Sequence, residues 1–143
     1  MTYQIISERQ APTYKIGCPA DAYKAFARYA RAKTERFIVA SLNGAHEIIR
    51  IRIVTVGLVS RCLVAPREVF VGPITDMASC IVVSHNHPSG HHETVSDKDI
   101  TLSNRLRDAG ELLNIPLLDH IITSRNGFTS LVERGLLTRS ASV

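Results

Sequence analysis

A short apolar run followed directly by a histidine-rich motif restricts the fold more than any other part of the sequence. Residues 79–84 read SCIVVS, a nearly continuous apolar run typical of a strand buried in the centre of a sheet. The residues that follow read HNHPSG. The sequence therefore predicts a central strand that carries the chain directly to His85.

Further strands are predicted on both sides of this run. They are expected at 36–42, 58–64, 117–123 and 128–130. Another, half-buried strand is expected where Ile49, Ile51 and Ile53 alternate with Arg50 and Arg52. Asn43-Gly44 favours a hairpin between the strand at 36–42 and this alternating strand.

Helices are expected between these strands, at 19–33, at 66–71 and from Ser96 to Pro116. Pro19 suits the first position of a helix, and Gly72-Pro73 is expected to interrupt the second one. Helical spacing predicts two buried faces, formed by Ala22, Phe26 and Tyr29 in the first helix and by Leu102, Leu106, Ala109 and Leu113 in the third. Helices interleaved with a mixed β-sheet predict an α/β sandwich.

Length and composition predict a single globular domain over residues 1–143. A chain of 143 residues with 45% hydrophobic and 21% charged residues can bury one sizeable core. Residues 1–17 are expected to form an N-terminal arm or edge strand, and residues 138–143 a frayed tail. Cys18, Cys62 and Cys80 are an odd number at wide spacing, which argues against a disulfide framework.

The sequence gives no sign of a membrane segment. No apolar run approaches the roughly 20 residues that a membrane span needs, and residues 1–10 lack the apolar region of a signal peptide. We therefore expect a cytoplasmic protein without a membrane partner.

The positive charge is concentrated near the N-terminus. The net charge is +4, and residues 1–40 hold seven Lys and Arg against three Asp and Glu. On the helix at 19–33, Lys24, Arg28 and Arg31 lie opposite the apolar face, where they could contact the phosphates of a nucleic acid. The alternative is an ordinary solvated helix face.

The motif and the residues that follow it suggest a metal site. Period-two alternation directs His85 and His87 to one face of a strand, and Asp99 falls in the first turn of the third helix. Two imidazoles and one carboxylate leave the fourth position of a tetrahedral zinc ion open to water, as in catalytic sites. Glu35, just before the strand at 36–42, could act as the base, and Ser96 could stabilise an oxyanion.

Each of these residues also has a structural interpretation. A His-x-His pair in a loop is often unliganded, Ser96 and Asp99 have the spacing of a helix capping box, and Glu35 could simply flank a strand. His91 and His92 are either extra ligands or solvated loop residues. Asp119 or His120 could orient a ligand imidazole, although His120 could equally be a core histidine.

Taken together, the motifs resemble a known family. His85-x-His87-Pro88, followed by Ser96 and Asp99 with Glu35 far upstream, resembles the JAMM motif of the MPN/JAB metalloprotease domain. HNHPSG, PREVF at 66–70, AGELLNIPLLDHII at 109–122 and ERGLL at 133–137 more narrowly resemble the bacterial RadC family. The resemblance covers about residues 3 to 137.

The resemblance implies a fold, a reaction and a role for each motif residue. The implied fold is a three-layer, cytidine-deaminase-like JAB/MPN sandwich, here in a stand-alone form without the helix-hairpin-helix module of longer RadC proteins. It implies His85, His87 and Asp99 as ligands of one Zn²⁺ per chain, Glu35 as the carboxylate that activates water, and Ser96 as the oxyanion-stabilising hydroxyl. The implied activity is hydrolysis of a peptide or isopeptide bond in a protein or peptide substrate.

Two other classes of function compete with this hypothesis. The family name reflects a supposed link to DNA repair, so the domain could be a nucleic-acid-docking protein that uses its basic N-terminal helix. It could also be a metal-free scaffold, which is disfavoured because every JAMM position is filled.

Overall fold

A six-stranded mixed sheet runs through the centre of the protein, with the strand order β1-β3-β2-β4-β5-β6. The computed structural model describes residues 4–5, 14–56 and 64–138. The strands are β1 (Gln4–Ile5), β2 (Arg36–Leu42), β3 (Ile48–Val56), β4 (Cys80–Asn86), β5 (Leu117–Ser124) and β6 (Gly127–Ser130). β4 and β5 pair in parallel and every other neighbouring pair is antiparallel.

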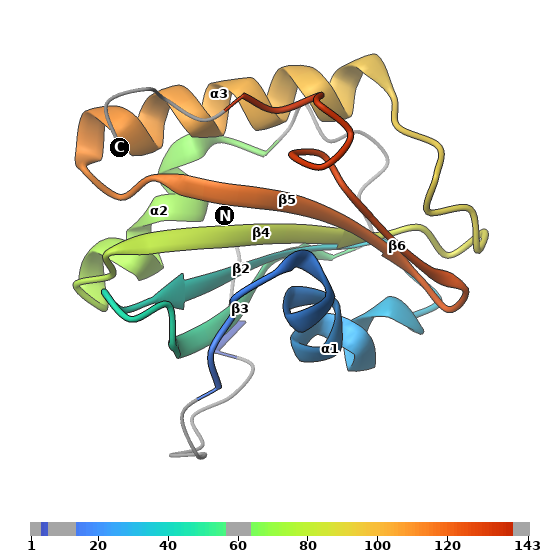
Figure 1. Cartoon of the computed structure of the whole chain (residues 1–143), viewed down its shortest axis with the longest axis horizontal. Helices are drawn as coiled ribbons and strands as arrows, with labels where there is room; N and C mark the ends of the chain where they lie inside the picture. The colour runs from blue at the N-terminus through green and yellow to red at the C-terminus, as the bar shows by residue number, and fades with distance from the viewer. Residues whose placement is uncertain (1–3, 6–13, 57–63, 139–143) are drawn as a thin grey trace.

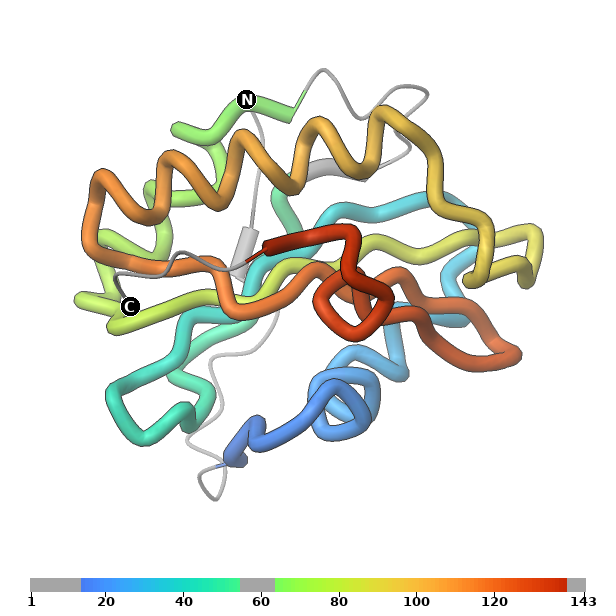
Figure 2. Tube along the Cα trace, turned by 45° about the horizontal axis from the view of Figure 1, so that its top comes forward, coloured from blue at the N-terminus to red at the C-terminus, as the bar shows by residue number. Residues whose placement is uncertain are grey.

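Helices cover both faces of this sheet and complete three layers. α1 (Pro19–Ala30) lies on one face, and α2 (Pro66–Thr75) and α3 (Asp97–Leu113) lie on the other (Figures 1 and 2). The core is accordingly divided in two, with Phe26, Ile38 and Val82 in the cluster beneath α1 and Phe37, Val83 and Leu106 in the cluster beneath α2 and α3. The predicted α/β sandwich with a mixed sheet is confirmed.

The central strand is as buried as its sequence predicts. Every residue of β4 is buried, including Ser84, His85 and Asn86. β4 pairs with β2 on one side and with β5 on the other, so its backbone polar groups are used in the sheet. The strand at 36–42 has the predicted bounds, and α1 begins at the predicted Pro19 with Ala22, Phe26 and Tyr29 buried.

Several predicted elements differ in the structure. α2 continues through Gly72 and Pro73 to Thr75, because both residues are buried on the helix face that packs against the sheet. In α3, Leu113 is 42% exposed and Gly110 takes the expected place in the core, because the helix ends at that point and Asn114 turns the chain into β5. The predicted strand at 58–64 lies largely outside the described residues, and Val64 is not part of a strand.

The strand that alternates isoleucine and arginine buries one of its arginines. Arg52 is 3% exposed and forms a two-pronged ion pair with Asp76, which directly follows α2. Gly72 makes room for it, since a Cβ atom at that position would lie 2.5 Å from Arg52 Nη1. The ion pair therefore fixes the C-terminal end of α2 to β3, which the alternation pattern alone did not predict.

We predict that Asp76→Asn destabilises the fold by about 3–5 kcal/mol, because it removes the carboxylate charge from the ion pair that holds the buried Arg52 guanidinium. Burial raises the pKa of the Asp76 carboxyl, but the hydrogen bonds and charge of Arg52 outweigh burial and hold that pKa below its ordinary value. The stability from this group is thus present above the carboxyl's unfolded pKa and is lost as the pH falls through the lower pKa of the folded state.

Urea denaturation at neutral and acidic pH should show that the wild type loses more stability on acidification than Asp76→Asn does. Asp108→Asn is the control, since the carboxylate of Asp108 is 68% exposed. Equal effects of the two substitutions would contradict the prediction.

Candidate metal centre

The candidate site lies at the C-terminal end of β4, where three connecting segments meet at one edge of the sheet. The segment before β2, the loop after β4 and the turn between β5 and β6 all lie at this edge in both views (Figures 1 and 2). His85 is the next-to-last residue of β4, and His87 directly follows that strand. Loops that follow a central strand often carry the polar side chains of a functional site.

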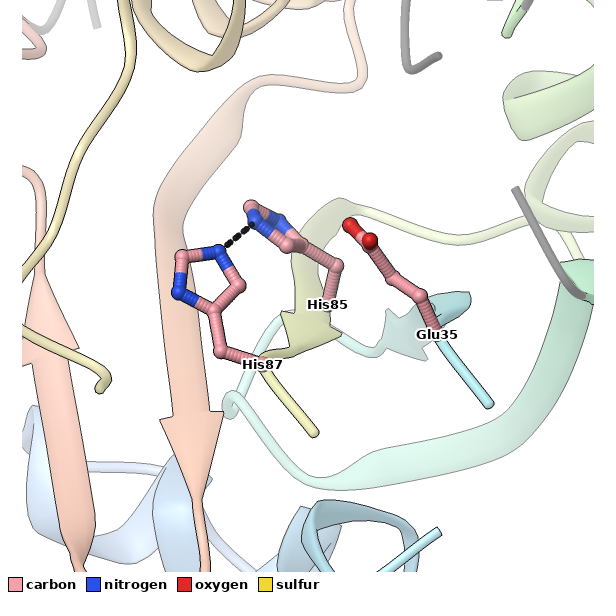
Figure 3. Close-up of side chains that lie close together, drawn as sticks. All are labelled: Glu35, His85 and His87. Atoms are coloured by element: carbon pink, nitrogen blue, oxygen red, sulfur yellow. Dashed lines mark hydrogen bonds between the residues drawn. The ribbon is translucent and has the colours of Figure 1, made fainter. Parts of the chain in front are cut away.

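Three of the predicted residues converge here. The Nε2 atoms of His85 and His87 are 3.0 Å apart, and one carboxylate oxygen of Glu35 lies within 4.8 Å of a ligand nitrogen of each histidine. Figure 3 shows the three side chains reaching one space from β4 and from the segment before β2. Asp99 joins through His85, because its Oδ1 lies 3.5 Å from His85 Nε2.

A chain of hydrogen bonds sets the tautomer of His85. The Ser103 hydroxyl donates its only hydrogen to the Asp99 backbone carbonyl oxygen (2.8 Å), so it can only accept from His120 Nδ1. His120 Nε2 is then an acceptor, and His85 Nδ1 donates to it over 2.8 Å. This assignment leaves an acceptor lone pair on His85 Nε2, on the side that faces His87 and Asp99.

The loop that follows His87 sets the tautomer of this histidine as well. Its Nδ1 donates to the backbone carbonyl oxygen of His91 over 2.8 Å, which leaves its Nε2 as an acceptor as well. Two acceptor nitrogens 3.0 Å apart, with a carboxylate 3.5 Å from one of them, repel one another unless a cation or a proton lies between them. The donor set therefore fits a cation.

The separations also fit the geometry of zinc. Ligand atoms bound about 2.0–2.1 Å from a tetrahedral ion lie roughly 3.3–3.4 Å apart. The observed separations are 3.0 Å between the two Nε2 atoms and 3.5 Å between His85 Nε2 and Asp99 Oδ1. These two separations suit a shared ion, but the ligand atoms that all lie within 4.8 Å of one another belong to Glu35, His85 and His87 and do not include Asp99. Asp99 would have to move closer to His87 for the three predicted ligands to share one ion.

Ser96 and Asp99 form the helix capping box that was the alternative interpretation of their spacing. The Ser96 hydroxyl accepts from the Asp99 backbone N–H, and Asp99 Oδ2 accepts from the Ser96 N–H, each over 3.1 Å. The capping uses only one carboxylate oxygen of Asp99, and the other lies on the side of His85. Capping and participation in the site are thus compatible for Asp99.

Glu35 is held in place by Asn86, which sequence reasoning overlooked. Asn86 Oδ1 accepts from the Arg36 N–H (2.7 Å), and its Nδ2 donates to the carbonyl oxygens of Ala32 (3.2 Å) and Thr34 (3.1 Å). These bonds tie the segment that carries Glu35 to the end of β4. The signal was the position of Asn86 itself, since a buried polar side chain between two histidines needs partners on the opposite face of the strand.

Other predicted residues lie outside this convergence. Asp119 accepts from the backbone N–H groups of His120 (2.7 Å) and Val132 (3.2 Å) and from the Ser130 hydroxyl, so it holds the turn after β6. The side chain of His91 is exposed, and His92 Nδ1 contacts Thr129 Oγ1 at 3.2 Å. The backbone of His91, not its ring, contacts the site.

The basic stripe begins on the exposed side of α1, as predicted, but Arg31 directly follows the helix, because α1 ends at Ala30 and not at residue 33. Lys24, Arg28 and Arg31 are exposed, and the guanidinium carbon of Arg28 lies 5.1 Å from the centre of the Tyr29 ring. Whether this stripe contacts a nucleic acid remains a prediction.

The loop after His87 is braced by the turn between β5 and β6. Arg125 Nη1 donates to the Pro88 carbonyl oxygen (2.9 Å), and Asn126 Nδ2 donates to the Gly90 carbonyl oxygen (3.0 Å). Gly90 has φ +90, and a Cβ atom there would lie 2.8 Å from Asn126 Nδ2. The close approach and the positive φ both explain the glycine of HNHPSG.

A family profile described as RadC-like JAB domain matches residues 16–136, which include every residue of this site. The chain belongs to the RadC-like JAB domain family. Relatives named UPF0758 protein are 50% identical over 103 residues in Methanospirillum hungatei and 41% identical over 125 residues in Alkaliphilus metalliredigens. These matches cover 72% and 87% of this chain and 45% and 53% of the two relatives.

A relative from Clostridium tetani with the same name is 36% identical over 138 residues, which is 96% of this chain and 60% of that protein. This RadC-like JAB domain thus spans about half the length of the curated relatives that it matches. In the part of the chain that the structure describes, no helix has the length and apolar character needed to cross a membrane.

We predict that Asn86→Leu destabilises the domain by about 1–3 kcal/mol, because the Arg36 N–H and the carbonyl oxygens of Ala32 and Thr34, which are part-buried, lose their partner. Amide hydrogen exchange at Arg36 should become much faster, because that N–H loses its acceptor. Asn104→Leu is the control, since Asn104 accepts only from Arg107 at the surface of α3. Unchanged exchange at Arg36 in Asn86→Leu would show that Asn86 does not hold the segment before β2.

Proposed function

We propose that this domain is a zinc-dependent hydrolase that cleaves an amide bond in a protein or peptide. The observation that carries the proposal is the pair of acceptor nitrogens of His85 and His87, turned toward each other at 3.0 Å by separate hydrogen bonds. Membership of the RadC-like JAB family supports the same class of function.

His85, His87 and Asp99 are the residues that would hold the ion. Their two neutral imidazoles and one carboxylate are a donor set that suits zinc and leaves a position for a small molecule. A zinc ion there would supply Lewis-acid chemistry, which makes water more acidic and polarises a carbonyl group.

Glu35 is the proposed general base. Its carboxylate oxygen lies within 4.8 Å of both histidine nitrogens, a separation that one water molecule can span. The carboxylate would take a proton from the attacking water and pass it to the nitrogen of the leaving amine. Asn86 holds the segment before β2, so that the carboxylate keeps this position while the proton moves.

Ser96 is the proposed oxyanion donor. Its hydroxyl oxygen accepts from the Asp99 N–H in the capping box, which leaves the hydroxyl hydrogen available. That hydrogen could be donated to the carbonyl oxygen of the substrate as negative charge develops there.

His120 and Ser103 are proposed to position the metal ligands rather than to contact the substrate. Together they keep the hydrogen of His85 on Nδ1, away from the ion. These hydrogen bonds support the interpretation of His120 as a residue that orients a ligand imidazole, and for Asp119 the same interpretation stays a prediction. The nucleic-acid alternative has only the exposure of the α1 stripe in its favour, which an ordinary solvated face shares.

We predict about one zinc per chain by elemental analysis of the purified protein. His87→Ala and Asp99→Ala should lose the metal, whereas Glu35→Gln should retain it without turnover of any peptide that the wild type hydrolyses. Zinc at a hundredfold excess over its Kd should stabilise the wild type by about 2.7 kcal/mol, measured by thermal unfolding with and without a chelator.

His46→Ala is the control for this experiment, because His46 lies in the β2–β3 connection, away from the site. No bound metal, together with an unfolding midpoint that zinc does not change, would rule out the proposed function. Loss of metal from Glu35→Gln would instead make Glu35 a ligand.

We predict that Ser103→Ala weakens zinc binding by about 10–100-fold, because it removes the acceptor that fixes the His120 and His85 tautomers. Thr101→Ala is the matched control, since Thr101 is exposed on the same helix. Competition with a chromophoric chelator measures both affinities. Equal affinities in the two variants would show that the hydrogen-bond chain does not tune the ligands.

A further inference from the structure

A groove lies beside the candidate metal centre, between the C-terminal end of α1 and the loop after β4. Its volume is about 480 Å³, within the range of small-ligand sites. It is lined by Ala30, Arg31, Ala32, Lys33, Pro88, Arg125 and Asn126.

The lining combines apolar and cationic side chains. Ala30, Ala32 and Pro88 contribute carbon surface, and Arg31, Lys33 and Arg125 contribute three positive charges without any acidic residue. Among the described residues, Arg31 and Lys33 take part in no ion pair. Their charges are therefore available to a ligand.

One wall of the groove is rigid. Arg125 is held against the Pro88 carbonyl oxygen at 2.9 Å, and Asn126 against the Gly90 carbonyl oxygen at 3.0 Å. The opposite wall, at residues 32–34, is tied to β4 by the side chain of Asn86. A preorganised groove loses little conformational entropy when a ligand binds.

Both walls are neighbours of the candidate metal centre along the chain. Lys33 lies two residues before Glu35 in the chain, and Pro88 follows His87. The segments that form the groove thus continue, within one or two residues, into those that carry Glu35 and His87.

We propose that this groove binds an acidic peptide segment, with aspartate or glutamate side chains facing Arg31 and Lys33. Its use as a substrate subsite, next to the bond that is cleaved, rests on the proposed function. Binding of the acidic segment itself does not.

The lining favours a peptide over a nucleic acid. Single-stranded nucleic acids are usually bound by aromatic side chains on which the bases stack, together with a long charged track. None of the residues that line the groove is aromatic. The apolar and cationic side chains of the lining instead match a peptide whose backbone and acidic side chains lie along the groove.

Fluorescence anisotropy with labelled decapeptides tests the proposal. One peptide is rich in glutamate, and its partner carries glutamine at the same positions. We expect wild-type protein to bind the glutamate peptide about tenfold more tightly, and Arg31→Glu/Lys33→Glu to lose this preference. The matched control is Lys24→Glu/Arg28→Glu, which makes the same charge change on exposed residues outside the groove lining.

The outcomes separate this proposal from its alternatives. Equal weakening by the two double variants, or no preference for glutamate in the wild type, would overturn it. Tighter binding of a labelled DNA oligonucleotide that depends on Lys24 and Arg28 would overturn it in favour of a nucleic-acid surface. The assay is run once with zinc and once with a chelator. Peptide binding can then be measured even if the protein binds no metal.

Discussion

The direction of the His85 ring depends on one buried hydrogen bond, from its Nδ1 to His120 Nε2 (2.8 Å). The bond crosses between the two parallel central strands and continues through Ser103 to the backbone of α3. With the Ser103 hydroxyl donating to the Asp99 carbonyl oxygen, the hydrogens of this buried chain take the one direction described above, and each member has a partner within the protein. That arrangement turns an acceptor nitrogen toward Asp99 and His87.

The sandwich gives this bond its rigid support. β4 lies between β2 and β5, and helices cover both faces, so a shift of β4 would disturb two strand pairings and two core clusters. The ends of the strand are freer, and there Asn86 fixes the segment that carries Glu35 while Arg125 and Asn126 fix the loop after His87. The geometry of the candidate site therefore depends on side chains that bind the backbone of its loops.

Local patterns predicted the elements wherever a single physical signal dominated. The bounds of the strand at 36–42 and the start of α1 at Pro19 follow from β-propensity and from the fixed φ of proline. The pattern was wrong about the end of α2 and about Arg52. Both depend on packing between α2 and β3, since Gly72 makes room for the guanidinium that binds Asp76.

The sequence by itself determined which chemical groups the site contains, because the alternation of HNH and the first turn of the helix after Ser96 place donors at fixed local positions. Only the tertiary structure decided how these groups are used. The tautomer of His85 and the bonds from Asn86 to the Glu35 segment need partners that are distant in sequence. The tautomer of His87 and the different contacts of the two Asp99 carboxylate oxygens need a fixed loop conformation. No local pattern contains such contacts, because they exist only once the sheet has formed.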